Sequence, residues 1–342
     1  ALQQESGTEY LLNVYAYAKY PSEMIPEGHE VAREQFVLNG NSYFAGQKST
    51  TGAIDMKEEN NVLFFTCGDV RISFNKRNGE LNGYRYQDKM LLGHAPQPQF
   101  WRAPTDNDFG NRMGILCNVW RTAGQNKEFK GMNVERKDRA VTLTSIYYLR
   151  DVASDYTVKY TVYADGRVEV NGSWKAGNIA LPEIPRFGMQ MTLAQEFDQF
   201  SWYGRGPWEN YSDRNTASFI GKYTSTVDEQ YVAYIRPQEN GNKTDVRWLT
   251  LTNKEGFGLR IDGLQPLSVS ALRNYPEDFD AGLTKSQRHI NDINPRKAVV
   301  LHVDLAQRGV GGDNSWGMYP HEPYLLKAKE YTYGYVISPV VK

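Results

Sequence analysis

Apolar and polar residues alternate with a period of two along much of this 342-residue chain. In VRISFN, residues 70–75, the alternation places Val70, Ile72 and Phe74 on one side of an extended segment and polar residues on the other. A segment of this kind predicts a β-strand with one buried face. YTVKYTVY, residues 156–163, repeats the pattern. Because amphipathic helical patterns are scarce, the sequence predicts an all-β fold.

Turn signals separate the alternating segments. Asn78-Gly79 follows the first segment, and Asp165-Gly166 leads from the second into RVEVNGSW. Pairs such as Asn-Gly and Asp-Gly favour the tight turns of antiparallel hairpins. The segments FGLRID, AVVLHVDL and YTYGYVIS continue the alternation. Many short strands joined in this way are typical of a β-sandwich or barrel.

A domain boundary is expected near residue 52. Residues 1–52 contain two predicted strands, EYLLNVYAYA and EVAREQFVL, on either side of the loop PSEMIPEG. Two strands are a marginal folding unit, so residues 1–52 are expected to be the end of a domain that begins earlier. GQKSTTG then has the composition of a linker, and residues 53–342 continue without an obvious break. We interpret the start, ALQQESGTEY, as a cut inside a longer polypeptide, although a processed N-terminus would look the same.

Charge and hydropathy argue against two classes of partner. The chain has 39 basic and 40 acidic residues, a net charge of −1, and these residues are well mixed. A nucleic-acid-binding protein normally has a basic excess or stripe, so we expect no nucleic-acid partner. No window approaches the length of apolar sequence that spans a bilayer, so we expect no membrane partner either. The sequence does not identify the cellular compartment.

The two cysteines, Cys67 and Cys117, do not form a disulfide framework, and no Cys/His spacing suggests zinc. We predict that both are thiols buried in the core, because free cysteine is among the most buried residue types.

Carboxylates cluster in three short polar segments, which raises the question of glycoside hydrolysis. That reaction uses two carboxylic side chains that flank the scissile bond. The three pairs are Asp106 with Asp108, Glu209 with Asp213, and Asp278 with Asp280. Turns and helix caps hold carboxylates for structural reasons, and nothing in the sequence places two of them in one apolar pocket. A structural role is therefore the favoured interpretation of each pair.

Metal and histidine chemistry have weak support. The TDND segment with Asp106, Asp108 and Gly110 has some likeness to a calcium loop, but a third acidic position and the terminal Glu are missing. No metal ligand is assigned. His289 lies in a polar loop and His302 in a predicted strand, where a structural hydrogen bond is the commoner role. Only His289 is retained as a possible groove residue.

The segment WYGRGPWENYSDR, residues 202–214, concentrates aromatic, charged and turn-forming residues. One interpretation is a tight corner between strands, in which Glu209 and Arg214 pair to compensate buried charge. The other is a loop that lines a groove for a polar ligand, with Glu209, Asp213 and Arg214 facing it. The sequence leaves both open.

A second unusual segment is GVGGDNSWG, residues 309–317. Glycine, Asp, Asn and Ser favour turns, whereas Trp usually lies in a core or anchors a contact. The segment therefore predicts a turn-rich loop that carries Trp316. Two fates of this side chain remain open, namely a loop that folds back into the core and a loop that projects the ring outward.

Five motifs then occur in order, RAPTDND, YGRGPWENYSDR, RPQENG, RHI and GVGGDNSW. With them the chain resembles the C-terminal part of the bacterial β-galactosidases of glycoside hydrolase family 2. Residues 53–342 resemble the last, "small chain" domain of that family. Residues 1–52, with PEGHEVAREQF, resemble the end of the immunoglobulin-like β-sandwich domain before it. The resemblance implies a large antiparallel β super-sandwich, similar in fold to galactose mutarotase.

The resemblance also implies a division of function. In the family, a preceding (β/α)₈ barrel carries two catalytic glutamates of a retaining mechanism and binds magnesium and sodium. None of those motifs occurs here, so we expect no catalytic residue, metal ligand or cofactor in this chain, and no hydrolysis by the chain alone. The barrel, the galactoside substrate and further copies of the full enzyme are the expected partners.

One residue is carried over from the family. The Trp of its G-x-G-G-D-x-S-W loop reaches into the barrel and stacks on the sugar, and Trp316 matches that position. Gly311, Gly312, Asp313 and Ser315 match its support.

Two rival functions remain. The first is an independent carbohydrate-binding module that would use Trp202, Trp208 or Trp316, although we expect little or no sugar binding by the isolated chain. The second is an epimerase of the mutarotase type, which would need a His acid and a Glu base in one cleft. No such pair can be named from the sequence, and a shared fold is a poor guide to function.

Overall fold

The computed structural model describes residues 5, 7–39, 43–44, 51–283, 288–314 and 316–341. The chain divides into two compact units, Ala1–Gln47 and Lys48–Lys342. The first unit contains an antiparallel hairpin of β1 (Tyr10–Tyr17) and β2 (Glu30–Asn39), which are the two strands predicted there. Its assignment to an immunoglobulin-like domain stays a prediction. Most of the predicted linker lies outside the described residues.

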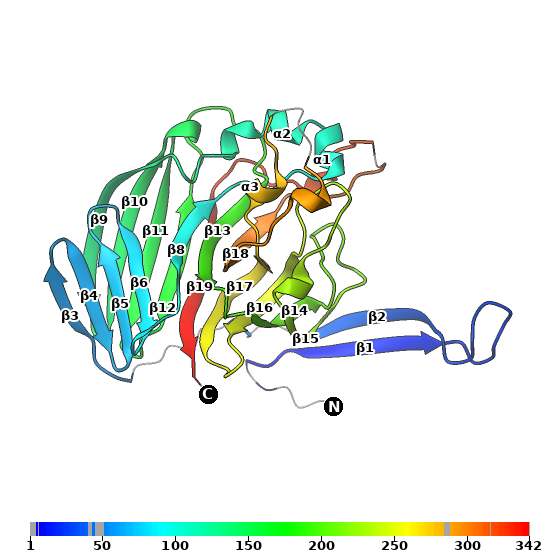
Figure 1. Cartoon of the computed structure of the whole chain (residues 1–342), viewed down its shortest axis with the longest axis horizontal. Coiled ribbons are helices and arrows are strands. Elements are labelled where there is room, and N and C mark those ends of the chain that lie inside the picture. Colours follow the sequence, from blue (N-terminus) through cyan, green and yellow to red (C-terminus); the bar gives the residue numbers. More distant parts are fainter. Residues whose placement is uncertain are drawn as a thin grey trace. The chain divides into compact units, whose positions relative to one another are not determined.

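Two antiparallel sheets form the described part of the second unit (Figure 1). The smaller sheet has the order β3-β4-β5-β6-β7, with β3 (Asp55–Glu59), β4 (Val62–Cys67), β5 (Val70–Asn75), β6 (Glu80–Tyr86) and β7 (Lys89–Met90). The main path of the larger sheet is β15-β14-β16-β17-β19-β12-β11-β10-β9. From β17 the sheet branches to β18, then β13, then β8. Its strands are β8 (His94–Gln99), β9 (Lys127–Lys137), β10 (Ala140–Leu149), β11 (Ser154–Tyr163), β12 (Val168–Trp174), β13 (Arg186–Ala194), β14 (Gln199–Gly206), β15 (Phe219–Thr226), β16 (Lys243–Thr252), β17 (Gly258–Leu272), β18 (Ala298–Gln307) and β19 (Tyr331–Val340).

The helices of the described residues are short. The α-helices are α1 (Asp106–Gly110), α2 (Met113–Leu116) and α3 (Pro276–Phe279), and the 3₁₀ turns are η1 (Asn118–Trp120), η2 (Arg150–Val152), η3 (Asp228–Gln230), η4 (Ile290–Asp292) and η5 (Glu322–Tyr324). None of these helices is long and apolar enough to cross a bilayer. The three α-helices gather at one end of the large sheet (Figure 1). The all-β, antiparallel architecture predicted from the alternating pattern is confirmed.

The two sheets pack face to face over one hydrophobic core. The ring of Phe74 on β5 meets that of Tyr160 on β11 edge to face, with centroids 5.1 Å apart. Strand β12 shows the predicted alternation, since every second residue from Val168 to Trp174 is buried. The free thiols of Cys67 and Cys117 are buried in the same core, as predicted. Alternation and turn chemistry therefore produce the hairpins, and burial of the apolar faces holds the sheets together.

The branch of the large sheet has a second, polar face. On β13, Phe187 and Met189 point into the core, while Gly188, Gln190 and Thr192 lie on the opposite face. On that face, the strand register places Gln97 of β8 and His302 of β18 on either side of Gln190. A small second hydrophobic cluster of Ala103, Leu272 and Phe279 joins the segment before α1, the end of β17 and helix α3.

Candidate functional site

Trp316 lies on the loop that follows β18, and its side chain is 85% exposed in the described chain. The loop turns through Asp313 and Asn314, whose Oδ1 accepts a hydrogen bond from the Trp316 N–H at 2.9 Å. The Asp313 Oδ1 lies 2.6 Å from the Nε2 of His321. Ser315, the remaining predicted support residue, lies outside the described residues. The indole therefore projects outward rather than folding back into the core.

The stem of this loop is held by buried arginine. Arg102, which is fully buried, donates from Nη2 to the carbonyl oxygen of Gly309 at 2.9 Å and from Nη1 to the carbonyl oxygen of Arg308. Buried carbonyl oxygens at the end of a strand need such donors, because no ladder partner remains for them. The loop thus leaves the sheet in a fixed direction.

Asp108 compensates the charge of two arginines in this stem. Its Oδ2 lies 2.9 Å from Arg102 Nη2, and its Oδ1 lies 2.5 Å from Arg308 Nη1. All three side chains are at most 1% exposed. Glu183, 3.3 Å from the Nε of Arg308, supplies a second negative charge. Buried ions are tolerated only when they are paired in this way.

The local sequence explains why Asp108 points inward. Thr105 caps α1, and Asp108 closes a reciprocal capping box, in which its Oδ2 accepts from the Thr105 N–H at 3.0 Å. Its carboxylate is therefore occupied by guanidinium and backbone donors. The weak likeness to a calcium loop has its physical explanation here, because the cations near this carboxylate are arginines. Among the described residues, no group of three or more His, Cys, Asp or Glu could hold a metal ion.

Glycines allow the loop stem to pass close to Asp213. The Gly311 N–H donates to Asp213 Oδ2 at 2.8 Å. A Cβ atom placed on Gly309 would lie 2.5 Å from the same oxygen, and one on Gly312 would lie 2.6 Å from the Met318 carbonyl oxygen. Side chains at these two positions would clash, so the glycines are required by close approach. Asp213 thus contacts the predicted loop, as a backbone acceptor.

Glu209 and Arg214 form an ion pair at the corner between β14 and β15, as one of the two interpretations of this segment had it. Arg214 Nη2 donates to Glu209 Oε1 at 2.6 Å, and the Gly241 N–H donates to Glu209 Oε2 at 2.7 Å. Arg214 also lines a pocket of ≈ 250 Å³, together with Asp106 and with Val310 from the Trp316 loop. The structure therefore brings Asp106, Asp108, Asp213 and Arg214 to the base of that loop.

The remaining predicted residues lie elsewhere. His289 is exposed, and its N–H donates to Asp292 Oδ2 at 2.8 Å in η4. Asp278 pairs with Arg296 at 2.6 Å, and the buried Asp280 pairs with Arg121. These carboxylates have structural partners. The three carboxylate pairs do not meet in one cleft.

A buried cluster around Arg186 was not predicted. Its Nη2 donates to Glu239 Oε1 at 2.9 Å, its Nη1 lies 2.8 Å from His302 Nδ1, and its Nε lies 3.2 Å from Asp304 Oδ2. Burial raises the pKa of Asp304 to about 8, with Arg186 opposing and Glu239 reinforcing the shift. Burial, and then Arg186, hold the pKa of His302 well below its usual range. The sequence offered two signals, RPQENG, which contains Glu239, and His302, for which a structural hydrogen bond was the favoured role.

The Arg186 cluster contains a His and a Glu, the two residue types that the epimerase alternative requires in one cleft. His302 and Glu239 do contact the same guanidinium, but their exposed fractions are 4% and 7%. A general acid and base must reach a substrate hydroxyl within hydrogen-bond distance. These two side chains are oriented toward Arg186, so the arrangement serves charge compensation.

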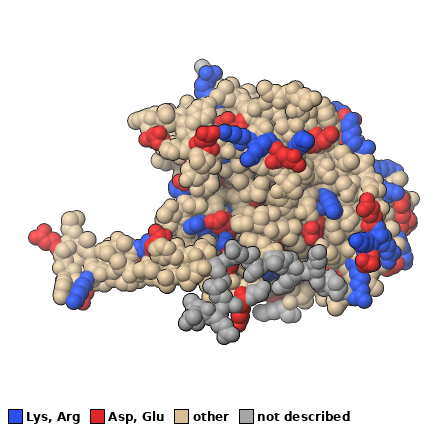
Figure 2. Space-filling view, turned by 180° about the vertical axis from the view of Figure 1, so that it is seen from behind, with Lys and Arg blue, Asp and Glu red and all other residues tan. Residues whose placement is uncertain are grey.

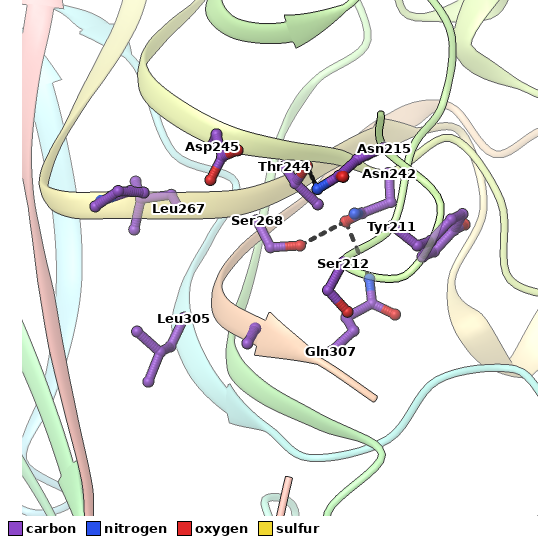
Figure 3. A pocket seen from close by; sticks show the side chains of 12 residues that line it. Tyr211, Ser212, Asn215, Asn242, Thr244, Asp245, Leu267, Ser268, Leu305 and Gln307 are labelled. Carbon is purple, nitrogen blue, oxygen red and sulfur yellow. Dashed lines mark hydrogen bonds between the residues drawn. The ribbon is translucent and has the colours of Figure 1, made fainter. Parts of the chain in front are cut away.

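A compact pocket of ≈ 170 Å³ lies where the pairing of β16 with β17 is interrupted (Figure 3). Ser268 Oγ and Gln307 Nε2 both donate to Asn242 Oδ1, at 2.9 and 3.0 Å (Figure 3). The Asn242 Nδ2 in turn donates to the Asn210 carbonyl oxygen. The polar walls of this pocket thus bond chiefly to one another.

The surface charges are mixed. On the face drawn in Figure 2, acidic and basic side chains are interspersed, and no large area of one sign is visible. Of the tryptophans considered for sugar contact, Trp202 is 1% exposed and belongs to the core, whereas Trp208 is 60% exposed. Trp202 is therefore wrong as a candidate for binding a ligand at the surface.

The chain matches one known protein family over most of its length. Residues 66–337 match the family model described as "Beta galactosidase small chain". A β-galactosidase of Priestia megaterium is 35% identical over 340 residues, which are 99% of this chain and 32% of that protein. One of Halalkalibacterium halodurans is 30% identical over 330 residues, 95% of this chain and 32% of the relative. The chain thus spans about a third of the length of these relatives. A solved galactose mutarotase related enzyme from Lactobacillus acidophilus is similar with a TM-score of 0.38 and 11% identity, covering 84% of this chain and 97% of that one.

Proposed function

Since the chain belongs to the β-galactosidase small chain family, we propose that it forms the C-terminal part of an enzyme that hydrolyses terminal β-galactosides and that it supplies Trp316 to the rim of the active site. The proposal rests on the exposed indole of Trp316, which lies on a loop whose stem is held by hydrogen bonds from the buried Arg102. A flat aromatic ring suits the apolar C–H face of a pyranose, and an indole held at the surface is free to cover one.

The size of the effect follows from the area that the ring can cover. Covering ~50 Å² of apolar sugar surface contributes on the order of 1 kcal/mol. The stem contacts from Arg102 and Asp213 limit the conformations of the loop before substrate arrives, so less entropy is lost on binding. Such a contribution changes affinity and the choice of acceptor, but it does not break a bond.

We assign bond cleavage to another domain of the longer protein. A retaining glycosidase uses two carboxyl groups about 5 Å apart, one of them free to attack. In this chain the carboxylates near the loop are engaged, Asp108 with two arginines and Glu209 with Arg214. Magnesium and sodium, which the family resemblance implies for the barrel, would supply electrostatic stabilisation there. The role of this chain is to position an aromatic wall beside that site.

The test uses the longer β-galactosidase that carries this chain. Trp316→Ala should raise KM for lactose about fivefold, the equivalent of ~1 kcal/mol, and should change the ratio of transfer to hydrolysis. Trp208→Ala, which removes an exposed indole outside the loop, is the matched control and should leave both unchanged. Equal kinetics for Trp316→Ala and the unaltered enzyme would exclude the stacking role. Release of galactose by the isolated chain at an enzyme-like rate would exclude the assignment of catalysis to another domain.

A further inference from the structure

A pocket of ≈ 530 Å³ opens where β6 and β8 lie beside β13. None of its lining residues belongs to the Trp316 loop or to the pocket at the base of that loop. Its size lies within the range of small-molecule sites in proteins. The polar face of the branch described above forms one wall of this pocket.

Strand register places its polar side chains in pairs. Gln97 of β8 lies opposite Gln190 of β13, and His94 lies opposite Thr192. Cross-strand partners on one face of an antiparallel pair are close neighbours. Two amides, an imidazole and a hydroxyl therefore line one wall, and all four residues border the pocket.

The two amides are oriented by partners outside the pocket wall. Lys127 Nζ donates to Gln97 Oε1 at 2.5 Å, and Gln99 Nε2 donates to Gln190 Oε1 at 3.3 Å. The side-chain oxygens of Gln97 and Gln190 thus each accept a hydrogen bond. The Nε2 group of each residue has two N–H donors, and these find no acceptor in the described part of the chain. The imidazole of His94 likewise has no hydrogen-bond partner in the described part of the chain. The wall presents donors that are already oriented and still unused.

The charge of the pocket selects a neutral ligand. Glu80 lines it and pairs with Lys127 at 3.0 Å, so the two charges compensate. An anionic ligand would approach the Glu80 carboxylate, and that carboxylate is already paired with Lys127, which does not line the pocket, so it offers little attraction to a cation. A ligand hydroxyl can donate to Glu80 and accept from the amides. Tyr275, which also borders the pocket, offers an aromatic contact for C–H groups.

We propose that this pocket binds a neutral saccharide of one or two rings, independently of Trp316. The ligand class follows from the unused amide donors, the compensated charge and the aromatic side chain. The resemblance to a part of a longer enzyme predicts little or no sugar binding by the isolated chain, and this proposal departs from that expectation. The pairing of Gln97 with Gln190 supplies a different basis for affinity and does not rest on the function proposed for the loop.

The experiment is a titration of the 342-residue chain with lactose and with methyl β-galactoside, followed by calorimetry and by ligand-observed NMR. We expect saturable binding in the millimolar range that weakens about tenfold in Gln190→Leu and in His94→Ala, as expected for a lost hydrogen-bond partner. Gln125→Leu and His289→Ala change exposed residues of the same type elsewhere and should bind as the unaltered chain does. Galacturonate should bind more weakly than methyl β-galactoside. His94 is exposed, so its variant is expected to fold even if Gln190→Leu does not.

Trp316→Ala separates this proposal from the previous one. We expect binding by the isolated chain to survive that substitution. Absence of saturable binding by the unaltered chain would overturn the proposal, as would equal losses in the variants and their controls. Loss in Trp316→Ala with no change in Gln190→Leu and His94→Ala would assign the sugar to the loop. A failed stacking role in the longer enzyme, by contrast, would leave this result unaffected.

Discussion

Gly110 and Gly317 touch backbone to backbone. A Cβ atom placed on Gly110 would lie 2.6 Å from the Gly317 Cα and 2.6 Å from the Trp316 carbonyl oxygen. Gly317 itself has φ +110°, which side chains rarely allow. The end of α1 therefore packs directly against the loop that carries the exposed indole. The position of Trp316 depends on a residue some two hundred positions earlier in the chain.

Gly110→Ala should displace the loop without unfolding the protein. The new methyl group meets backbone atoms that cannot rotate away, which costs about 1–3 kcal/mol if the loop stays in place. We expect the loop to move instead, with a shifted and narrower ¹⁹F resonance for 5-fluorotryptophan at position 316. Gly131→Ala is the control, because nothing lies within 4 Å of its added Cβ. An unchanged Trp316 resonance in Gly110→Ala would contradict the close packing.

Asp108→Asn should destabilise the second unit strongly. The substitution removes the carboxylate that compensates Arg102 and Arg308, which are both buried. Breaking a buried pair by removing one partner typically costs about 3–5 kcal/mol, and urea unfolding measures it. Asp106→Asn, at a side chain that is 63% exposed, should change stability by less than about 0.5 kcal/mol. Equal unfolding midpoints for the two variants would show that the cluster does not hold the stem.

Local sequence patterns predicted the strands, whereas the stem of the Trp316 loop is formed by contacts between residues far apart in the chain. Asp165-Gly166 and the alternation around it specify the hairpin of β11 and β12, because turn chemistry and side-chain period act on neighbours. Arg102 and Arg308 are separated by 206 residues, and only the folded sheet brings them to Asp108. No local pattern encodes that contact, so the stem could not be predicted.

The tryptophans of one segment illustrate the same limit. Trp202 lies within β14 and alternates into the core, whereas Trp208 follows the end of that strand and is exposed. Both lie in one short segment of similar composition, and the end of β14 at Gly206 separates the buried residue from the exposed one. The turn-rich composition around Trp316 predicts the loop but leaves open whether the indole is buried, and only the folded chain shows that it is exposed.

Asp304 should make stability fall as the pH rises from about 4 toward 8. Burial raises the pKa of its carboxyl to about 8, so the folded state binds a proton that the unfolded chain has already released over this range. The contribution of Asp304 to the free energy of unfolding is therefore largest below the pKa that this carboxyl has in the unfolded chain, and it is lost as the pH approaches 8. Asp304→Asn should flatten this slope in urea unfolding measured at several pH values, with Asp292→Asn as an exposed control. An unchanged slope would mean that Asp304 ionises in the folded protein as readily as in the unfolded chain.

Lys243 should produce the opposite dependence at higher pH. Its side chain is 2% exposed, and burial lowers its pKa from 10.5 to about 8. Between these values the unfolded chain binds the proton and the folded state does not, so stability rises with pH across that window. Lys243→Met removes a buried ammonium group and should stabilise the protein near neutral pH by at most about 3 kcal/mol. The lost hydrogen bond from Nζ to the Gly241 carbonyl oxygen reduces that gain.

The difference between Lys243→Met and the unaltered chain is the quantity to follow. It should be largest at pH 7 and should shrink toward zero near pH 10, because the lysine is then neutral in both states. Lys222→Met, at an exposed position on β15, should show no pH-dependent difference. If Lys243→Met is less stable than the unaltered chain at pH 7, then the contact with Gly241 and the Trp202 ring, 5.3 Å from Nζ, outweighs the cost of burying the charge.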